Sequence, residues 1–340
     1  MHGKGQVDVT VVIPVYYNEG SLRPTVEKTS AVLERCLSVR KYEIIFVDDG
    51  SGDRSLDEAL ELRREHPGRV IVIELTRNFG QVAALEAGSR AAEGDLIVNM
   101  SADLQDPPSL IEKLIEAHTE EGYDIAVGTR ATREETLCRR VTSRAFYYLM
   151  RKLCFSNIPR GGFDFILFTC RVRDEILSHY EANPFWQGKL LWSGYSAKFI
   201  PYHRRDRELG VSRWTFGKKV KYLLDGLMAY SYFPLRAMSM LGILTFLAGI
   251  LYALTIVVTY AFGNVPFKGW APIMIILLLA SGLQMLMLGI LGEYLWRTLD
   301  QVRQRPRYVI RRMHGREPLH QAAGGEGHAA RESGRRRAGE

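Results

Sequence analysis

Acidic and amide side chains follow several short apolar segments in the first 130 residues of the chain. Each of these turns could be an ordinary cap or Asx turn, in which a side chain only satisfies nearby backbone groups. Acids after three separate segments are harder to explain in that way. Converging carboxylates favour a divalent cation such as Mg²⁺ or Mn²⁺, which commonly brings a phosphate-bearing ligand. The three turns read Asn18-Glu19, Asp48-Asp49-Gly50-Ser51 and Ser101-Ala102-Asp103-Leu104-Gln105-Asp106.

The elements that must position these turns alternate in type along the chain. Short apolar runs typical of strands alternate with helical patterns, which predicts an α/β fold with a mostly parallel sheet and helices on both faces. Ligands of open α/β sheets bind beyond the carboxyl ends of the strands, where these turns lie. The expected strands are residues 7–15, 42–47, 69–75, 95–100 and 123–127, and the expected helices lie near 21–38, 53–65, 80–93 and 108–121.

Charge and motif searches exclude several classes of protein. The 340 residues carry a net charge of +7, but residues 301–340 alone hold ten arginines against four glutamates. A nucleic-acid-binding domain would carry basic residues on its folded elements, so no nucleic-acid partner is expected. No P-loop motif occurs, and Gly50-Ser51-Gly52 is followed by Ser55 where a dinucleotide fingerprint needs its third glycine. The composition also excludes collagenous, disulfide-scaffold and disordered chains.

Two long segments near the end of the chain carry no charged residue. They cover residues 237–267 and 269–292, and roughly 20 apolar residues suffice for a helix to cross a bilayer. Lysines and arginines flank the pair on its outer sides, whereas Lys268 alone lies between the segments, so we expect both flanks in the cytoplasm. The arginines after the second segment are expected to meet anionic lipid headgroups; they are Arg303, Arg305, Arg307, Arg311 and Arg312.

The segment before the first span has an amphipathic pattern. Apolar residues at positions 216, 220, 223, 224 and 227 share one helical face, and lysines at 218, 219 and 221 lie toward the other side. This pattern predicts a helix lying in the membrane surface, with an ordinary packed helix as the alternative.

Three motifs together resemble the inverting family-2 glycosyltransferases of GT-A fold. Two spans after the Ala-Asp-Leu-Gln block make the chain most similar to the polyprenyl-phosphate branch, which includes dolichyl-phosphate mannose synthase and bacterial O-antigen glucosyl carriers. The resemblance covers about residues 7–312. Its motifs are Val12-Ile13-Pro14-Val15-Tyr16-Tyr17-Asn18-Glu19, Val47-Asp48-Asp49-Gly50-Ser51 and Ala102-Asp103-Leu104-Gln105-Asp106-Pro107-Pro108.

The resemblance implies a role for individual residues. It assigns nucleotide-sugar binding to Pro14, Tyr16, Glu19 and Asp48, and a loop that closes over the donor diphosphate to Arg207, Ser212 and Arg213. It assigns the metal and diphosphate ligands to Asp103 and Gln105, with Ser101 where the family usually has its first aspartate. It assigns the acceptor phosphate to Arg130, Arg139 and Ser143, and an active-site aspartate to Asp164.

We therefore predict an enzyme that moves a single sugar from a UDP-, GDP- or dTDP-sugar to an undecaprenyl- or dolichyl-type phosphate, for modification of cell-envelope glycans. Mg²⁺ or Mn²⁺ is the expected cofactor, membrane lipids are expected partners, and a homo-oligomer is compatible with the resemblance. One alternative is a processive polysaccharide synthase of the same superfamily, although the Gln-x-x-Arg-Trp motif of those enzymes is absent. Another is a non-catalytic membrane scaffold with a degenerate transferase domain, which only Ser101 favours.

The expected organisation places the chain in the cell membrane with the catalytic domain and both termini in the cytoplasm. The expected parts are a GT-A domain (1–212), an amphipathic interfacial helix (213–233), transmembrane helices (234–262 and 270–296) joined by a short extracytoplasmic loop (263–269), a basic juxtamembrane segment (297–314) and a disordered tail (315–340).

Overall fold

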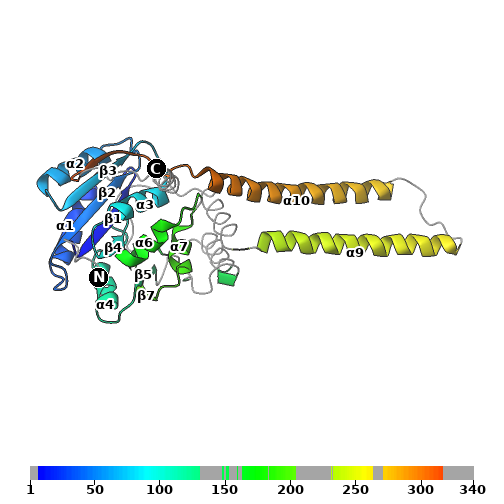
Figure 1. Ribbon diagram of the computed structural model, residues 1–340, viewed down its shortest axis with the longest axis horizontal. Coiled ribbons are helices and arrows are strands. Elements are labelled where there is room, and N and C mark those ends of the chain that lie inside the picture. Colours follow the sequence, from blue (N-terminus) through cyan, green and yellow to red (C-terminus); the bar gives the residue numbers. More distant parts are fainter. Residues whose placement is uncertain are drawn as a thin grey trace, which may run out of the picture.

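The structure is a computed structural model that describes residues 7–130, 148, 151–152, 159, 163–182, 184–203, 231, 233–262 and 271–316. In this part of the chain a layered α/β domain stands at one end and two long helices extend away from it (Figure 1). The eight-stranded sheet has the order β7-β5-β6-β4-β1-β2-β3-β8. Its parallel centre consists of β1 (Val9–Val15), β2 (Tyr42–Asp48), β3 (Val70–Leu75) and β4 (Leu96–Asn99).

Helices cover both faces of the sheet, as the alternating pattern predicts. Successive side chains of a strand point to opposite faces, so Val11 and Ile13 belong to one core and Val12 belongs to the other. The first core includes α1 (Leu22–Leu33), α2 (Ser55–Glu65) and α4 (Leu110–Thr119). The second includes α3 (Gln81–Ala91), α6 (Cys170–Ser178) and α7 (Trp186–Trp192).

The far side of the sheet contains two strands that the sequence analysis does not predict. β6 (Ile166–Thr169) lies antiparallel between β4 and β5 (Ile125–Arg130), and β7 (Ala197–Tyr202) pairs parallel with β5. Because β6 runs opposite to its neighbours, it begins at the edge where β4 and β5 end. Residues just before β6 are therefore placed beside the turn that follows β4.

The chain returns to the sheet after the second long helix, which corrects part of the expected organisation. Residues 297–314 were expected to be a juxtamembrane segment, but β8 (Ile310–His314) pairs antiparallel with β3 at the edge of the sheet. The arginines expected at lipid headgroups include Arg307, which pairs with Glu86 of α3, and Arg311, whose Nη1 lies 2.9 Å from Glu74 Oε1 of β3. The open edge of β3 and these acids account for the difference, because they give the returning chain backbone and charge partners.

The two long helices match the expected membrane spans in length and composition. α9 (Phe233–Ala261) and α10 (Ala271–Arg303) lie against one another, and the Tyr294 hydroxyl is 3.5 Å from the Ser231 carbonyl oxygen (Figure 1). The most apolar windows, Leu235–Tyr252 and Leu279–Arg303, are long and apolar enough to cross a membrane and have none of their residues buried within the structure. α10 continues beyond the expected end at residue 296, to Arg303.

Candidate active site

Strand register brings three polar side chains to one place at the carboxyl edge of the sheet. β5 ends at Arg130, and Tyr202 at the end of β7 is its register partner. Asp164 lies two residues before β6, whose first residue, Ile166, is paired with both Asn99 and Val127. The sheet therefore places Asp164 and Tyr202 beside Arg130, although the three residues are far apart in sequence.

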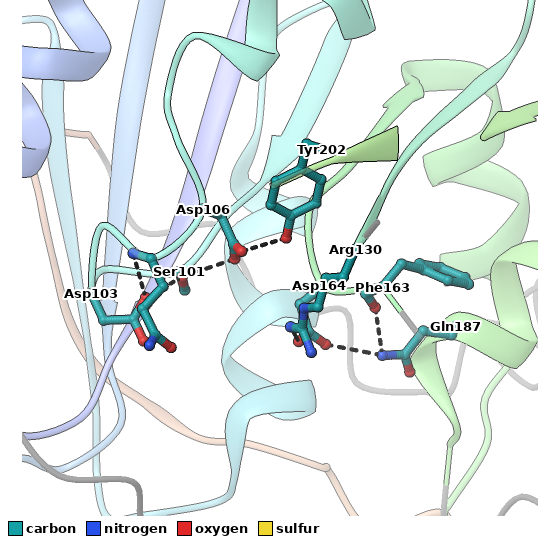
Figure 2. A network of polar contacts seen from close by, with 9 residues as sticks. Ser101, Asp103, Asp106, Arg130, Phe163, Asp164, Gln187 and Tyr202 are labelled. Atoms are coloured by element: carbon teal, nitrogen blue, oxygen red, sulfur yellow. Dashed lines mark hydrogen bonds and ion pairs between the residues drawn. The ribbon is translucent and has the colours of Figure 1, made fainter. Parts of the chain in front are cut away.

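Arg130 and Asp164 form an ion pair between Nη2 and Oδ2 (Figure 2). The Arg130 side chain is 7 % exposed and that of Asp164 is 40 % exposed, so the arginine lies beneath a carboxylate that faces the solvent. Burial alone would lower the pKa of Arg130, but the nearby Asp164 and Asp106 outweigh it and raise the pKa above its ordinary value. A charged guanidinium is thus held at the edge of the sheet, next to the turn after β4.

That turn forms a compact loop around Asp103. Asp103 Oδ1 accepts hydrogen bonds from Ser101 Oγ at 2.7 Å and from the Gln105 backbone N–H at 3.3 Å. Ser101 thus takes a hydrogen-bonding role at the position where the family usually has an aspartate. Leu104 between them has a φ of 54°, a left-handed conformation uncommon for a residue with a side chain. The loop presents the carboxylate of Asp103 and the amide of Gln105 from one turn of backbone.

Asp106 and Tyr202 connect this loop to Arg130. The Tyr202 hydroxyl donates to Asp106 Oδ1, and Ser101 Oγ lies 3.3 Å from Asp106 Oδ2 (Figure 2). Burial and the neighbouring Asp106 raise the pKa of Tyr202 above its ordinary value, so this hydroxyl remains a donor at neutral pH. A Cβ on Gly128 would lie 2.6 Å from Leu110 Cδ2 and 3.2 Å from Tyr202 Cε1, so a side chain at this position would have to displace the Leu110 side chain beside this contact.

The ends of β1 and β2 carry the residues assigned to nucleotide-sugar binding. Pro14 is half-buried in β1 and Tyr16 follows the strand, with its backbone N–H donating to Asn18 Oδ1 at 2.9 Å. Glu19 is exposed, and its Oε2 lies 3.4 Å from the Arg54 backbone nitrogen. Asp48 is buried, which raises the pKa of its carboxyl against the opposing hydrogen bonds from Ser51.

The convergence of acids from three strand ends is not seen in the described residues. Asp49 accepts the backbone N–H groups of Phe79 and Gly80 at 2.7 and 2.9 Å, and so holds the start of α3 instead of facing the site. In the described part of the chain no group of three or more His, Cys, Asp or Glu side chains is placed to hold a metal ion. Among the described residues the buried acids Asp48 and Asp49 at the end of β2 accept hydrogen bonds from local backbone donors, and the expected convergence of carboxylates stays a prediction.

Five of the assigned residues lie outside the described part of the chain, as does nearly all of the expected amphipathic helix. The five are Arg139, Ser143, Arg207, Ser212 and Arg213. Conversely, the structure adds three residues that the sequence analysis did not assign: Asp106, Gln187 and Tyr202. Asp106 belongs to a motif already recognised, whereas no signal in the sequence pointed to the other two, which reach the site only through β7 and α7.

Comparisons with known proteins show the family to which the chain belongs. Residues 10–179 match the model of the family "Glycosyl transferase family 2". The uncharacterized glycosyltransferase YkcC of Bacillus subtilis is 35 % identical over 92 % of this chain and 95 % of its own length. An undecaprenyl-phosphate 4-deoxy-4-formamido-L-arabinose transferase of Pectobacterium atrosepticum is 32 % identical over 90 % of this chain and 93 % of its own. The bactoprenol glucosyl transferase of Shigella phage SfII is 33 % identical over 91 % of this chain and 99 % of its own.

A solved structure of glucosyl-3-phosphoglycerate synthase from Mycobacterium tuberculosis is 14 % identical, with a TM-score of 0.44 over 65 % of this chain and 79 % of that chain. The sheet, the site at its carboxyl edge and the family match together define a GT-A-type glycosyltransferase. The chain belongs to glycosyl transferase family 2.

Proposed function

We propose that this enzyme transfers one sugar, with inversion, from a nucleotide-sugar to a polyprenyl phosphate at the cytoplasmic face of the membrane. The observation that carries the proposal is the buried, charged Arg130, paired with Asp164 and adjacent to the Ser101–Asp106 loop. An anionic acceptor needs such a guanidinium, and the names of the relatives from Pectobacterium and the Shigella phage support a lipid phosphate as that acceptor.

Arg130 would bind the acceptor phosphate in line with the anomeric carbon of the sugar. A phosphate monoester is mostly dianionic at neutral pH, since its second pKa is near 6, and so it attacks without a strong general base. Asp164 then positions the acceptor or balances the positive charge that develops on the sugar. Arg139 and Ser143 complete the acceptor site in this proposal, and Arg207, Ser212 and Arg213 close over the donor.

Asp103 and Gln105 fit a divalent cation by the chemistry of their oxygen donors. One carboxylate and one amide are hard ligands, and Mg²⁺ in particular is commonly held by one or two carboxylates together with substrate phosphates. We assign Mg²⁺ or Mn²⁺ to this pair, where it would stabilise the charge that develops on the leaving nucleoside diphosphate. Pro14, Tyr16, Glu19 and Asp48 would hold the nucleoside, and Asp103 is the most informative residue to change.

The two long helices support a location in the membrane. α9 and α10 expose apolar side chains along their length, and a hairpin of two such helices would place both of its flanks on one side. Basic residues on those flanks favour the cytoplasmic side in this proposal. A lipid phosphate at headgroup level would then lie near the catalytic domain.

The test is an in vitro transfer assay with the full chain in lipid nanodiscs. Purified protein, Mn²⁺, undecaprenyl phosphate and a panel of labelled UDP-, GDP- and dTDP-sugars should yield a lipid-soluble product that mild acid cleaves. Asp103→Ala should reduce the rate by at least a hundredfold, whereas Asp174→Ala, an exposed acid on α6, should not. The absence of product with every sugar of the panel would refute the proposal. Full activity of Asp103→Ala would refute the assignment of Asp103 as a metal ligand.

A further inference from the structure

Asp164 is held from a second side by a residue with no assigned role. Gln187, the second residue of α7, donates from Nε2 to Asp164 Oδ1 at 3.3 Å and to the Phe163 carbonyl oxygen at 2.9 Å (Figure 2). Arg130 contacts the other carboxylate oxygen, Oδ2. The two oxygens of Asp164 therefore face different partners, one cationic and one neutral.

The helix that carries Gln187 is fixed by buried neighbours. Trp186 is almost fully buried and packs edge-to-face on Phe168 of β6, with ring centroids 6.3 Å apart. Lys189 is also buried and donates from Nζ to the His179 carbonyl oxygen at 2.8 Å. The Gln187 amide thus extends toward the site from a rigid support, which is what a group that orients another side chain requires.

Acceptor binding changes the partners of Asp164 unequally. A dianionic phosphate at Arg130 competes with Asp164 for the guanidinium, and the Nε of Arg130 is buried with no hydrogen-bond partner among the described residues. A planar guanidinium offers five N–H donors and can turn toward the stronger anion. Gln187 carries no charge, so it has little tendency to leave the carboxylate for the phosphate.

We propose that Gln187 is a positioning residue that keeps the Asp164 carboxylate oriented when Arg130 engages the acceptor phosphate. The inference rests on the proposed function, since it takes Arg130 as the acceptor site and Asp164 as the active-site acid. Gln187 itself acts through Asp164 and makes no contact with substrate in this account.

A double-mutant cycle tests this role. Gln187→Met keeps an unbranched side chain of similar length but removes the amide donor, and it should lower kcat about tenfold or more with the KM for the nucleotide-sugar unchanged. In an Asp164→Asn background, measured under single-turnover conditions, Gln187→Met should cause no further loss. A fall in kcat of less than twofold, or the same loss in both backgrounds, would overturn the proposal.

Gln301→Met is the matched control. Gln301 likewise makes two contacts through its amide, in this case both with backbone groups, at the Tyr180 carbonyl oxygen and the Ala182 N–H, but it lies away from the site. Its substitution should leave kcat unchanged. An equal loss of kcat in this control would show that amide loss acts through general stability and would count against a specific role for Gln187.

A structural readout separates this inference from the proposed function. In an experimental structure of Gln187→Met, the Asp164 side chain should leave the rotamer seen here or become disordered, whereas Trp186 and Lys189 should keep their positions. An unmoved Asp164 would refute the positioning role whether or not transfer activity is found. Absence of transfer by the wild-type chain, with Asp164 displaced in the variant, would refute the proposed function alone.

Discussion

The ion pair between Arg307 and Glu86 connects the chain that follows α10 to α3, and its loss should destabilise the catalytic domain. Both side chains are only 9 % exposed. Leaving one charge of such a buried pair without its partner costs about 3–5 kcal/mol. In Arg307→Met the carboxylate of Glu86 still has an electrostatic interaction with Lys189. We therefore expect a loss of stability at the lower end of that range, about 3 kcal/mol.

The expected loss is large enough to measure by thermal unfolding. For a domain of 150–250 residues, 1 kcal/mol shifts Tm by about 2–4 °C, so Arg307→Met should lower Tm by about 6–12 °C. The double variant Arg307→Met/Glu86→Leu, in which no charge is left buried, should recover most of the difference. Arg312→Met, at an exposed arginine on the following strand β8, is the control and should shift Tm by less than about 2 °C.

Two results would refute this reasoning. One is a Tm of Arg307→Met equal to that of the control, and the other is a double variant no more stable than the single one. The sequence-based expectation that Arg307 contacts lipid headgroups makes the opposite prediction. It requires weaker binding to anionic vesicles with an unchanged Tm, so both quantities should be measured on the same variants.

Three further predictions concern the acids of the catalytic domain. Burial raises the pKa of Glu43, which pairs with Arg316; Arg316→Leu should therefore cost about 3 kcal/mol at pH 8, and less as the pH falls toward 4.5 and Glu43 takes up a proton. Urea unfolding of the wild type and the variant at both pH values measures this difference in the free energy of unfolding. Tyr202→Phe should remove about 1.5–3 kcal/mol of stability by taking a donor from buried Asp106, and should raise the KM for the donor sugar. Because burial raises the pKa of Asp48, nucleotide affinity measured by calorimetry should decline with falling pH already above 3.8, and Asp48→Asn should abolish that pH dependence.

The parallel half of the fold could be predicted from the sequence because its strands are continuous apolar runs separated by helices. All five expected strands occur, and the four expected helices begin and end within a few residues of the expected limits. The strands β7 and β8 were missed because most of their residues are half-buried or exposed, whereas β6 is buried but only four residues long. β8 in particular reads Ile310–His314 with two exposed arginines, and it is a strand only because β3 offers it a free edge.

The site likewise contains residues that the sequence predicts and residues that it does not. Asp103 and Gln105 follow β4, a strand that the apolar pattern predicts, and a turn after such a strand must lie at the carboxyl edge of the sheet. Gln187 and Tyr202 follow no such rule. Tyr202 lies beside Arg130 because β7 pairs with β5 in one particular register, and Gln187 reaches Asp164 because α7 packs on β6.

This difference explains why the sequence indicates which residues bind ligands better than it indicates which residues orient them. The groups proposed to bind metal and nucleotide lie in short motifs, because each motif is supplied by one turn of backbone. Groups that orient Asp164 and the Ser101–Asp106 loop come from distant segments, and the antiparallel insertion of β6, the pairing of β7 with β5 and the packing of α7 on β6 bring them together. Variation in rate among relatives with the same motifs should therefore be sought in β6, β7 and α7, where a shift of register moves Asp164 and its partners without changing any motif residue.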